Sequence, residues 1–306
     1  MADERRNNDR RNDRRDGRAK AAEAHIADVD ARLAKDVERS ISELKIYDGS
    51  PKPEVEGHVP EVRIVDQDSV TAVMEQARGL ASACDLALLD FASFINPGGG
   101  YATGAWAQEE ALCSESTLYN VLVTQKAWYS ANRQRNINCQ LYRNRGIVVP
   151  KVRFERDKYH KYADVIVVAA PNARRARTEY HIDNETLVKA MRNRIRFVMA
   201  IADELGHDKL VLGAFGCGAF GWDASVVAEL FRKELAMGKH VATQVTFAIP
   251  SSRFEENLQR FEHAFANFPK KNDDPYVKLA DRPKAVVEQV EDDDDEEEDD
   301  WRKYLG

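Results

Sequence analysis

Two adjacent carboxylates, Glu109 and Glu110, are the residues of this sequence best suited to chemistry. They follow Gln108 at the start of an expected helix, and seven residues separate Gln108 from the triple glycine Gly98–Gly100. Carboxyl groups held in a closed site can give and take protons during a reaction. Acidic residues at the N-terminus of a helix also complement the helix dipole, and this simpler explanation suffices if the pair is considered alone.

Two glycine-rich segments indicate where a phosphate-bearing ligand would bind. The first is NPGGG, residues 96–100, after the apolar run LALLDF, and the second is GAFGCGAFG, residues 213–221, after KLVL. Ligands of open α/β sheets bind at the carboxyl ends of the strands, where glycines let backbone amides approach phosphate oxygens. Each loop alone is compatible with a simple tight turn. Neither has the Gly-Lys-Ser/Thr ending of a P-loop, and the second lacks the downstream acid of a dinucleotide fingerprint.

The elements around these loops alternate between strand and helix from residue 61 onward. Apolar runs predict strands at Val62–Val65, Leu86–Phe91, Ile147–Val152, Asp164–Ala170, Lys209–Ala214 and Gln244–Pro250. Apolar residues at helical spacing predict helices at Ser69–Ala81, Glu109–Gln125, Glu185–Leu205, Ala224–Met237 and Phe254–Phe268. Strands as apolar as VIVVAA require cover on both faces, so the sequence predicts a three-layer α/β/α sandwich.

The two ends of the chain depart from this pattern. Residues 1–17 are rich in Arg, Asn and Asp, and we expect a disordered arm because such a segment buries too little surface to offset its ordering entropy. A helical extension with an apolar stripe follows, up to the prolines at 51, 53 and 60. Residues 269–306 are expected to form a flexible tail, whose acidic run is either simply solvated or a docking segment for basic proteins.

The composition excludes several classes of protein. Without the ten consecutive acids at 291–300, the net charge of −7 becomes +3, so direct binding of nucleic acid is not expected. The sequence has neither an apolar run long enough to cross a membrane nor a secretory signal, which predicts an intracellular protein, cytoplasmic or, in a eukaryote, also nuclear. Its four widely spaced cysteines, without a Cys-x-x-Cys pair, predict neither a disulfide framework nor a metal site.

The longer motifs resemble one known family. The run DFASFINPGGGYATGAWAQEEALCSESTLY is similar to the signature of microbial-type poly(ADP-ribose) glycohydrolases, and VIVVAAPNARRA and LGAFGCGAFGWD follow in the same order. The resemblance covers roughly residues 20–268. It implies a macrodomain-like catalytic domain at 18–268, with a mixed sheet and an N-terminal helical extension.

The resemblance also implies site residues. Glu110 falls on the catalytic acid of the family, and Glu109 on the carboxylate that positions the ribose hydroxyls. The substrate-binding positions are Asn96, Gly98, Gly99, Gly100 and Gln108 in the first segment, and Gly216, Cys217, Gly218, Ala219, Phe220 and Gly221 in the second. Microbial members commonly have Asn-Phe-Ala at the positions where this chain has Asp90-Phe91-Ala92. The animal enzymes have Asp-Phe-Ala there, as this chain does. The segment QLYRNRGIVVPKVRFERDKYHKY keeps little of the family pattern, so no residue is assigned to the adenine.

By this resemblance the reaction is exo-acting hydrolysis of ribose–ribose O-glycosidic bonds in poly(ADP-ribose), with Glu110 as general acid and then base. The expected substrate is poly(ADP-ribose) or ADP-ribosylated protein, and neither metal nor cofactor is expected. Two alternatives stay open. One is a non-catalytic ADP-ribose-binding module on the same fold, and the other is a hydrolase that removes a single ADP-ribose from protein or nucleic acid.

Overall fold

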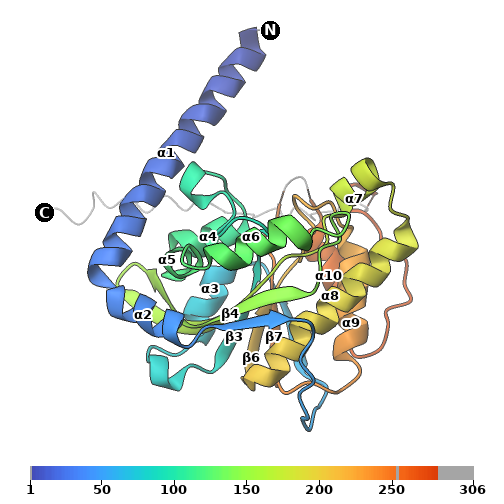
Figure 1. Ribbon diagram of the computed structural model, residues 1–306. Helices are drawn as coiled ribbons and strands as arrows, with labels where there is room; N and C mark the ends of the chain where they lie inside the picture. The colour runs from blue at the N-terminus through green and yellow to red at the C-terminus, as the bar shows by residue number, and fades with distance from the viewer. Residues whose placement is uncertain (1, 253–254, 282–306) are drawn as a thin grey trace, which may run out of the picture. The chain divides into compact units, whose positions relative to one another are not determined.

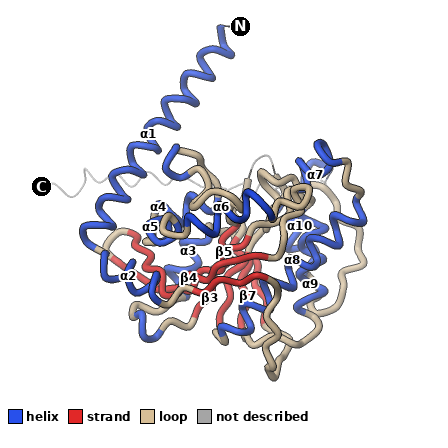
Figure 2. Tube along the Cα trace, viewed as in Figure 1, coloured by secondary structure: helices blue, strands red, loops and turns tan. Residues whose placement is uncertain are grey.

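A seven-stranded mixed sheet forms the centre of the protein in the computed structural model (Figures 1 and 2). Its order is β1-β4-β5-β3-β6-β7-β2, in which β1 and β4 run antiparallel to their neighbours and the other pairs are parallel. The strands are β1 (Lys45–Asp48), β2 (Glu61–Val65), β3 (Leu86–Phe91), β4 (Arg145–Arg156), β5 (Tyr159–Val168), β6 (Lys209–Leu212) and β7 (Gln244–Ala248). The apolar runs of β3 and β5 are buried on both faces, as a central parallel strand requires.

Helices cover both faces of the sheet and complete three layers (Figure 1). One face carries α1 (Ala2–Arg32), α2 (Ala34–Ser42), α3 (Ser69–Gln76), α4 (Gln108–Ser114), α5 (Leu118–Leu122) and α6 (Lys126–Arg135). The other carries α7 (Ala173–Tyr180), α8 (Asn184–Leu205), α9 (Ala224–Leu235) and α10 (Asn257–Phe265). The 3-10 turns η1 (Ala81–Ala83) and η2 (Tyr101–Thr103) precede and follow β3. The predicted α/β/α sandwich with a mixed sheet and N-terminal helices is confirmed.

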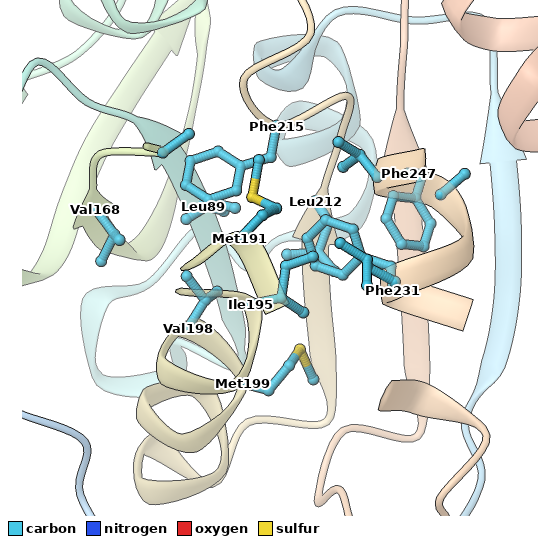
Figure 3. Close-up of a cluster of buried hydrophobic side chains, with 14 of the residues drawn as sticks. Leu89, Val168, Met191, Ile195, Val198, Met199, Leu212, Phe215, Phe231 and Phe247 are labelled. Carbon is cyan, nitrogen blue, oxygen red and sulfur yellow. The ribbon is translucent and has the colours of Figure 1, made fainter. Parts of the chain in front are cut away.

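Each face of the sheet has its own hydrophobic core. Alternate residues of β3 divide between them: Ala87 and Leu89 join the core under α8, whereas Leu86 and Leu88 join the core under α3 and α4. Figure 3 shows the first core, in which α8 presents Met191, Ile195, Val198 and Met199 to side chains of the sheet. These positions recur at the spacing of one helix face, so the sequence periodicity of α8 is a direct consequence of this packing.

The region predicted as one helix over Glu109–Gln125 contains two, α4 and α5. The residues between them pair instead with β4, because Glu115 O accepts a hydrogen bond from Glu155 N–H at 2.8 Å and Thr117 N–H donates to Arg153 O at 3.0 Å. This pairing ends α4 after seven residues. The strand β1 and the helices α6 and α7 were not predicted, because none of them has a long apolar repeat.

The predicted disordered arm at 1–17 differs from the structure, where residues 2–17 belong to α1. The arm was expected because it has little apolar surface to bury, yet charged side chains anchor it. Arg15 Nε donates to Thr103 O at 2.9 Å and Arg18 Nε to Gly104 O at 2.8 Å, so α1 is fastened to the turn that follows the triple glycine. The proposed boundary after residue 17 therefore falls inside a continuous helix.

The structure describes residues 2–252 and 255–281, and for residues 2–11 it describes the backbone alone. The chain divides into a large unit, residues 1–274, and a unit of residues 275–306, whose described part contains the short turn η3 (Leu279–Asp281). Residues 269–274 belong to the large unit, although a tail was predicted from 269. The acidic run lies outside the described residues. No helix in the described ranges has the length and hydropathy needed to cross a membrane.

Candidate active site

The two glutamates lie at the start of α4, against the backbone of the first glycine loop. Glu110 Oε1 accepts a hydrogen bond from the Gly100 N–H at 2.8 Å, and Glu109 Oε2 accepts one from the Ser93 N–H at 2.6 Å. Both residues are buried, with 6% and 3% of their surface exposed. The chain between β3 and η2 therefore fixes one oxygen of each carboxyl group.

Glycine is required where this loop meets the carboxyl groups. Gly98 and Gly99 have φ angles of +62° and +60°, in the left-handed region that side chains disfavour. A Cβ atom on Gly99 would lie 2.4 Å from Glu110 Oε1 and 2.8 Å from Glu109 Oε2. The triple glycine thus allows the backbone to lie directly on the two glutamates.

A third carboxyl group, Asp90, belongs to the same cluster. It lies on β3 with no exposed surface, and burial followed by the charge of Glu110 raises its pKa well above the ordinary range. Burial and the charge of Asp90 likewise raise the pKa of Glu109, against the lowering effect of the Ser93 hydrogen bond. The cluster therefore keeps protons at a pH at which exposed carboxyl groups are ionised.

Several oxygens of this cluster lack a protein partner. In the part of the chain that the structure describes, Glu110 Oε2, Glu109 Oε1 and both carboxyl oxygens of Asp90 are buried without a hydrogen bond. Buried polar atoms are normally paired, and an unpaired one often marks a site that a ligand, water or proton completes. The free oxygens of Glu109 and Glu110 are the natural place for ligand hydroxyl groups.

Gln108 ties the start of α4 to the sheet. Its Oε1 accepts a hydrogen bond from Phe91 N–H at 2.9 Å, and its Nε2 donates to Leu89 O at 2.9 Å and to Ser69 Oγ at 3.2 Å. The pairing of β3 with β6 ends at Leu88, so the Gln108 amide continues the hydrogen bonding of β3 beyond that point. Gln108 was predicted to bind substrate, and its amide is engaged by the protein, so it positions the glutamates that follow it.

The second glycine loop connects β6 to α9 and leaves backbone amides free. Within residues 2–252 and 255–281, the N–H groups of Gly218, Ala219 and Phe220 donate no hydrogen bond to the protein. The loop is anchored on either side of them, because Trp222 Nε1 donates to Pro171 O at 2.7 Å and Trp222 N–H to Gly216 O at 3.2 Å. Three consecutive unpaired N–H groups on a fixed loop suit an anion.

A cavity of about 510 Å³ lies between this loop and the start of α4. It is lined by Phe91 and Phe215, by the second loop, by the start of α3, and by the chain that follows β7. Among the described lining residues Arg156 is the only cation, and it is paired with Glu115 at 2.6 Å and Asp68 at 3.3 Å. Backbone amides rather than side-chain cations are therefore the groups available to hold a phosphate here.

The structure separates the predicted residues into two neighbouring sets. Gln108, Gly216, Gly218, Ala219 and Phe220 line the cavity. Gly98–Gly100 and the two glutamates are not among its lining residues, because they occupy the adjacent face of α4. A ligand in the cavity must extend past Gln108 toward the first loop to meet the glutamates.

An aromatic column links the two loops. Phe94, two residues before the first loop, stacks on Tyr142 with ring centroids 4.4 Å apart, and Tyr142 meets Phe220 of the second loop edge-on at 6.3 Å. Phe220 was predicted from the sequence, whereas Tyr142 was not, because the segment around it had no recognisable pattern. The column fixes the position of Phe220 relative to the first loop.

A buried arginine holds the segment that carries Tyr142. Arg194 of α8 is 1% exposed, and its guanidinium Nη2 donates to the carbonyl oxygens of Leu141, Tyr142 and Arg143 at 3.0–3.3 Å. Burial lowers the pKa of Arg194 to about 9. Residues 138–140 and 142 of this segment have positive φ angles, so these hydrogen bonds stabilise a backbone that non-glycine residues rarely adopt.

Three further predicted residues have other surroundings. Asn96 is exposed, and its Oδ1 accepts a hydrogen bond from Arg133 Nη2 at 3.1 Å. Cys217 is buried in the hydrophobic core under α8, and Gly221 lies against Arg174. Cys217 and Gly221 therefore shape the second loop, while Asn96 is the exposed first residue of the first loop.

Comparisons with known proteins agree with this architecture. Residues 20–157 match the family model described as microbial-type PARG, catalytic domain. A poly(ADP-ribose) glycohydrolase from Thermomonospora curvata, solved with the inhibitor ADP-HPD, is 27% identical with a TM-score of 0.68, over 82% of this chain and 100% of that one.

The chain carries a microbial-type poly(ADP-ribose) glycohydrolase catalytic domain. A second member, from Deinococcus radiodurans, was solved in complex with ADP-ribose and is 26% identical with a TM-score of 0.65, over 76% of this chain and 98% of its own. No curated protein sequence matches the chain significantly. As a poly(ADP-ribose) glycohydrolase by family and structural homology, the protein has the macrodomain-like fold that its motifs implied.

Proposed function

We propose that this glycohydrolase removes ADP-ribose units from the end of poly(ADP-ribose) chains, with Glu110 acting first as general acid and then as general base. The observation that carries the proposal is the state of the Glu110 carboxyl group. One oxygen is held by Gly100 N–H, and the other is buried without a partner among the described residues. Such an oxygen is favourable only when a proton, water or ligand satisfies it.

The two glycine loops support one position for the substrate. A member of the family has been solved with ADP-ribose. In this chain we infer that the diphosphate accepts hydrogen bonds from the free amides of residues 218–220, beside the cavity. The terminal ribose then passes Phe220 and Asn96 and reaches the triple glycine, where Glu109 Oε1 accepts a hydrogen bond from a ribose hydroxyl.

The reaction breaks the bond between the anomeric carbon of one ribose and the hydroxyl oxygen of the next. Glu110 donates its proton to that oxygen, which leaves as a hydroxyl group while positive charge develops on the sugar. The resulting carboxylate takes a proton from a water molecule, whose oxygen bonds to the anomeric carbon. The diphosphate fixes the sugar and offsets its positive charge.

The carboxyl groups beside Glu110 hold their protons more tightly than exposed carboxyl groups do. Asp90 and Glu109 both have raised pKa values, so protons are retained next to Glu110. The Gly98–Gly100 backbone covers these buried carboxyl groups, and their low exposure to water strengthens the electrostatic interactions among them. The exo mode rests on the resemblance to microbial members.

Turnover on three substrates tests the proposed function. We expect the protein to release free ADP-ribose from poly(ADP-ribose), with single units and not oligomers as the early products. Release of ADP-ribose only from a mono-ADP-ribosylated protein or nucleic acid would contradict the proposed function and favour a hydrolase that removes single ADP-ribose units. Tight ADP-ribose binding without any turnover would make the protein a binding module.

The variant Glu110→Gln tests the assigned acid. It should lower kcat on the polymer by roughly 10³-fold or more, since a positioned acid typically contributes about 10²–10⁴-fold, and should leave ADP-ribose affinity nearly unchanged. The matched control Glu75→Gln replaces an exposed glutamate of α3 and should keep full activity. Comparable turnover in Glu110→Gln would remove Glu110 from the mechanism.

A further inference from the structure

Three side chains with metal-binding atoms meet at the edge of the sheet opposite the glycine loops. Cys84 lies two residues before β3, His207 two residues before β6, and Asp164 lies in β5 beside Ala87 of β3. The strands β5, β3 and β6 are neighbours in the sheet. The cluster therefore lies at the amino ends of β3 and β6, whereas the glycine loops follow their carboxyl ends.

The three groups are already close together. Asp164 Oδ1 lies 3.5 Å from Cys84 Sγ, and Asp164 Oδ2 lies 2.9 Å from His207 Nε2. The three ligand atoms all lie within 4.8 Å of one another. A backbone N–H from Lys151 donates to Asp164 Oδ1 at 2.8 Å and fixes the orientation of the carboxylate. Cys84 Sγ also lies 3.5 Å from the Tyr162 carbonyl oxygen.

The arrangement does not suit a nucleophilic cysteine. The Asp164 carboxylate bridges the thiol and the imidazole, so the imidazole is not placed to take the thiol proton. Burial and the charge of Asp164 raise the pKa of Cys84 to about 12. Burial opposes ionisation of Asp164, but hydrogen bonds from His207 and Lys151 outweigh it and lower the Asp164 pKa, so the carboxylate is available as a ligand.

We propose that Cys84, Asp164 and His207 bind a divalent cation of the zinc type, with solvent as the fourth ligand. Thiolate, imidazole and carboxylate are the donors that Zn²⁺ combines in proteins. Bonds of about 2.0–2.3 Å to a tetrahedral ion place its ligands about 3.3–3.8 Å apart. The 3.5 Å between Cys84 Sγ and Asp164 Oδ1 lies in this range, and the 2.9 Å between Asp164 Oδ2 and His207 Nε2 would lengthen slightly to admit the ion. The Asp164 and His207 side chains keep 11% and 16% exposure, which leaves solvent access for a fourth ligand.

Binding replaces protons without any change of oxidation state. The cation forms bonds to Cys84 Sγ, His207 Nε2 and an oxygen of Asp164, while the thiol proton leaves to solvent and the proton between Nε2 and the carboxylate is displaced. Because the ligands come from three adjacent strands, the ion would tie β5, β3 and β6 together at the amino edge. This inference does not depend on the proposed glycohydrolase function.

Cobalt provides a direct spectroscopic test, since it occupies zinc sites and reports a coordinated thiolate. The full chain is stripped with a chelator and titrated with Co²⁺. We expect a thiolate-to-cobalt charge-transfer band that saturates at one equivalent and disappears when Zn²⁺ is added. Absence of the band, or its appearance only with a large excess of Co²⁺, would overturn the proposal.

Variants identify the ligands. Cys84→Ser should abolish the charge-transfer band. His207→Asn should lower Co²⁺ affinity by about 10-fold or more, because even loss of a hydrogen-bond partner of a ligand costs about 10–100-fold. The control Cys139→Ser removes an exposed thiol and should leave the band intact. Loss of the band in Cys139→Ser, or its retention in Cys84→Ser, would contradict the site. If Cys84→Ser does not fold, unchanged affinity in folded His207→Asn would contradict it equally.

Discussion

The two glycine loops of this protein use their backbone amides in opposite ways. In the first loop, Gly100 N–H donates a hydrogen bond to Glu110, and the glycines lie against buried carboxyl groups. In the second loop, residues 218–220 keep their N–H groups free of the described protein and face a cavity. We therefore propose that two loops of similar glycine content have different roles: one orders the reacting acids, and the other binds an anion. Substitutions in each loop should consequently affect different measurements.

The largest effect that separates the loops is expected for Glu109→Gln. The substitution replaces an acceptor oxygen by a group that donates, so a ribose hydroxyl can no longer donate to it. We expect kcat to fall by about 10²–10³-fold, as on removal of one preorganised hydrogen-bonding group, with little change in ADP-ribose affinity. Steady-state kinetics on poly(ADP-ribose) and calorimetry with ADP-ribose measure the two quantities. Normal kcat would show that Glu109 does not position the ribose.

Gly99→Ala tests whether the first loop must lie on the carboxyl groups. Its Cβ would approach Glu110 Oε1 to 2.4 Å in a backbone with φ of +60°, so the loop or the glutamate must move. A displacement of about 1 Å is expected to lower kcat by roughly 10²-fold. Gly17→Ala, whose Cβ has open space, is a control for the same change elsewhere. Full activity in Gly99→Ala would mean that the contact between loop and carboxyl group is not needed.

Asp90→Asn tests the shared protonation of the cluster through stability. The folded-state pKa of Asp90 is raised above its ordinary value of 3.8, so the folded protein binds more protons than the unfolded chain at pH values above that. The free energy of unfolding should then fall as pH rises from about 4 through the raised pKa. The fall is about 1.4 kcal/mol for each unit by which the folded-state pKa exceeds the unfolded-state pKa. In the variant this slope should be reduced, and the stability at pH 8 should be higher. Denaturant unfolding between pH 4 and 8 measures both, and parallel curves would exclude Asp90 as the titrating group.

The smallest effect is expected for Gly218→Ala in the second loop. A Cβ there meets nothing within 4 Å, so the melting temperature should not change. The methyl group would stand where a phosphate approaches the amides, and ADP-ribose binding should weaken by roughly 10-fold, about 1.4 kcal/mol. Gly216→Ala gives the contrast, since its Cβ would lie 2.8 Å from Trp222 and should lower stability. Unchanged affinity in Gly218→Ala would place the diphosphate elsewhere.

Apolar runs and glycine loops made much of the fold predictable. The bounds predicted for β3 are those of the structure, because LALLDF is apolar except for Asp90 and is followed by the turn residues of the first loop. The two glutamates and the triple glycine were likewise predicted to lie together, and they do. Such features depend on residues that are close in sequence and restricted in type.

Features held by distant polar contacts escaped prediction. Arg194 and Tyr142 meet through a left-handed segment without glycine, and nothing local in the sequence indicates that backbone. The cysteine spacing predicted no metal site, yet Cys84 and His207 approach Asp164 from 80 and 43 residues away. Only the strand order brings such groups together, and that order is a property of the whole chain.

The attachment of α1 to the turn after the triple glycine has a practical consequence. Arg15 and Arg18 satisfy the carbonyl groups of Thr103 and Gly104, three and four residues beyond Gly100. Removing residues 1–18 would return those oxygens to solvent and loosen the segment that leads into α4. A protease cut or a deletion that removes Arg15 and Arg18 is thus expected to lower the rate of the reaction.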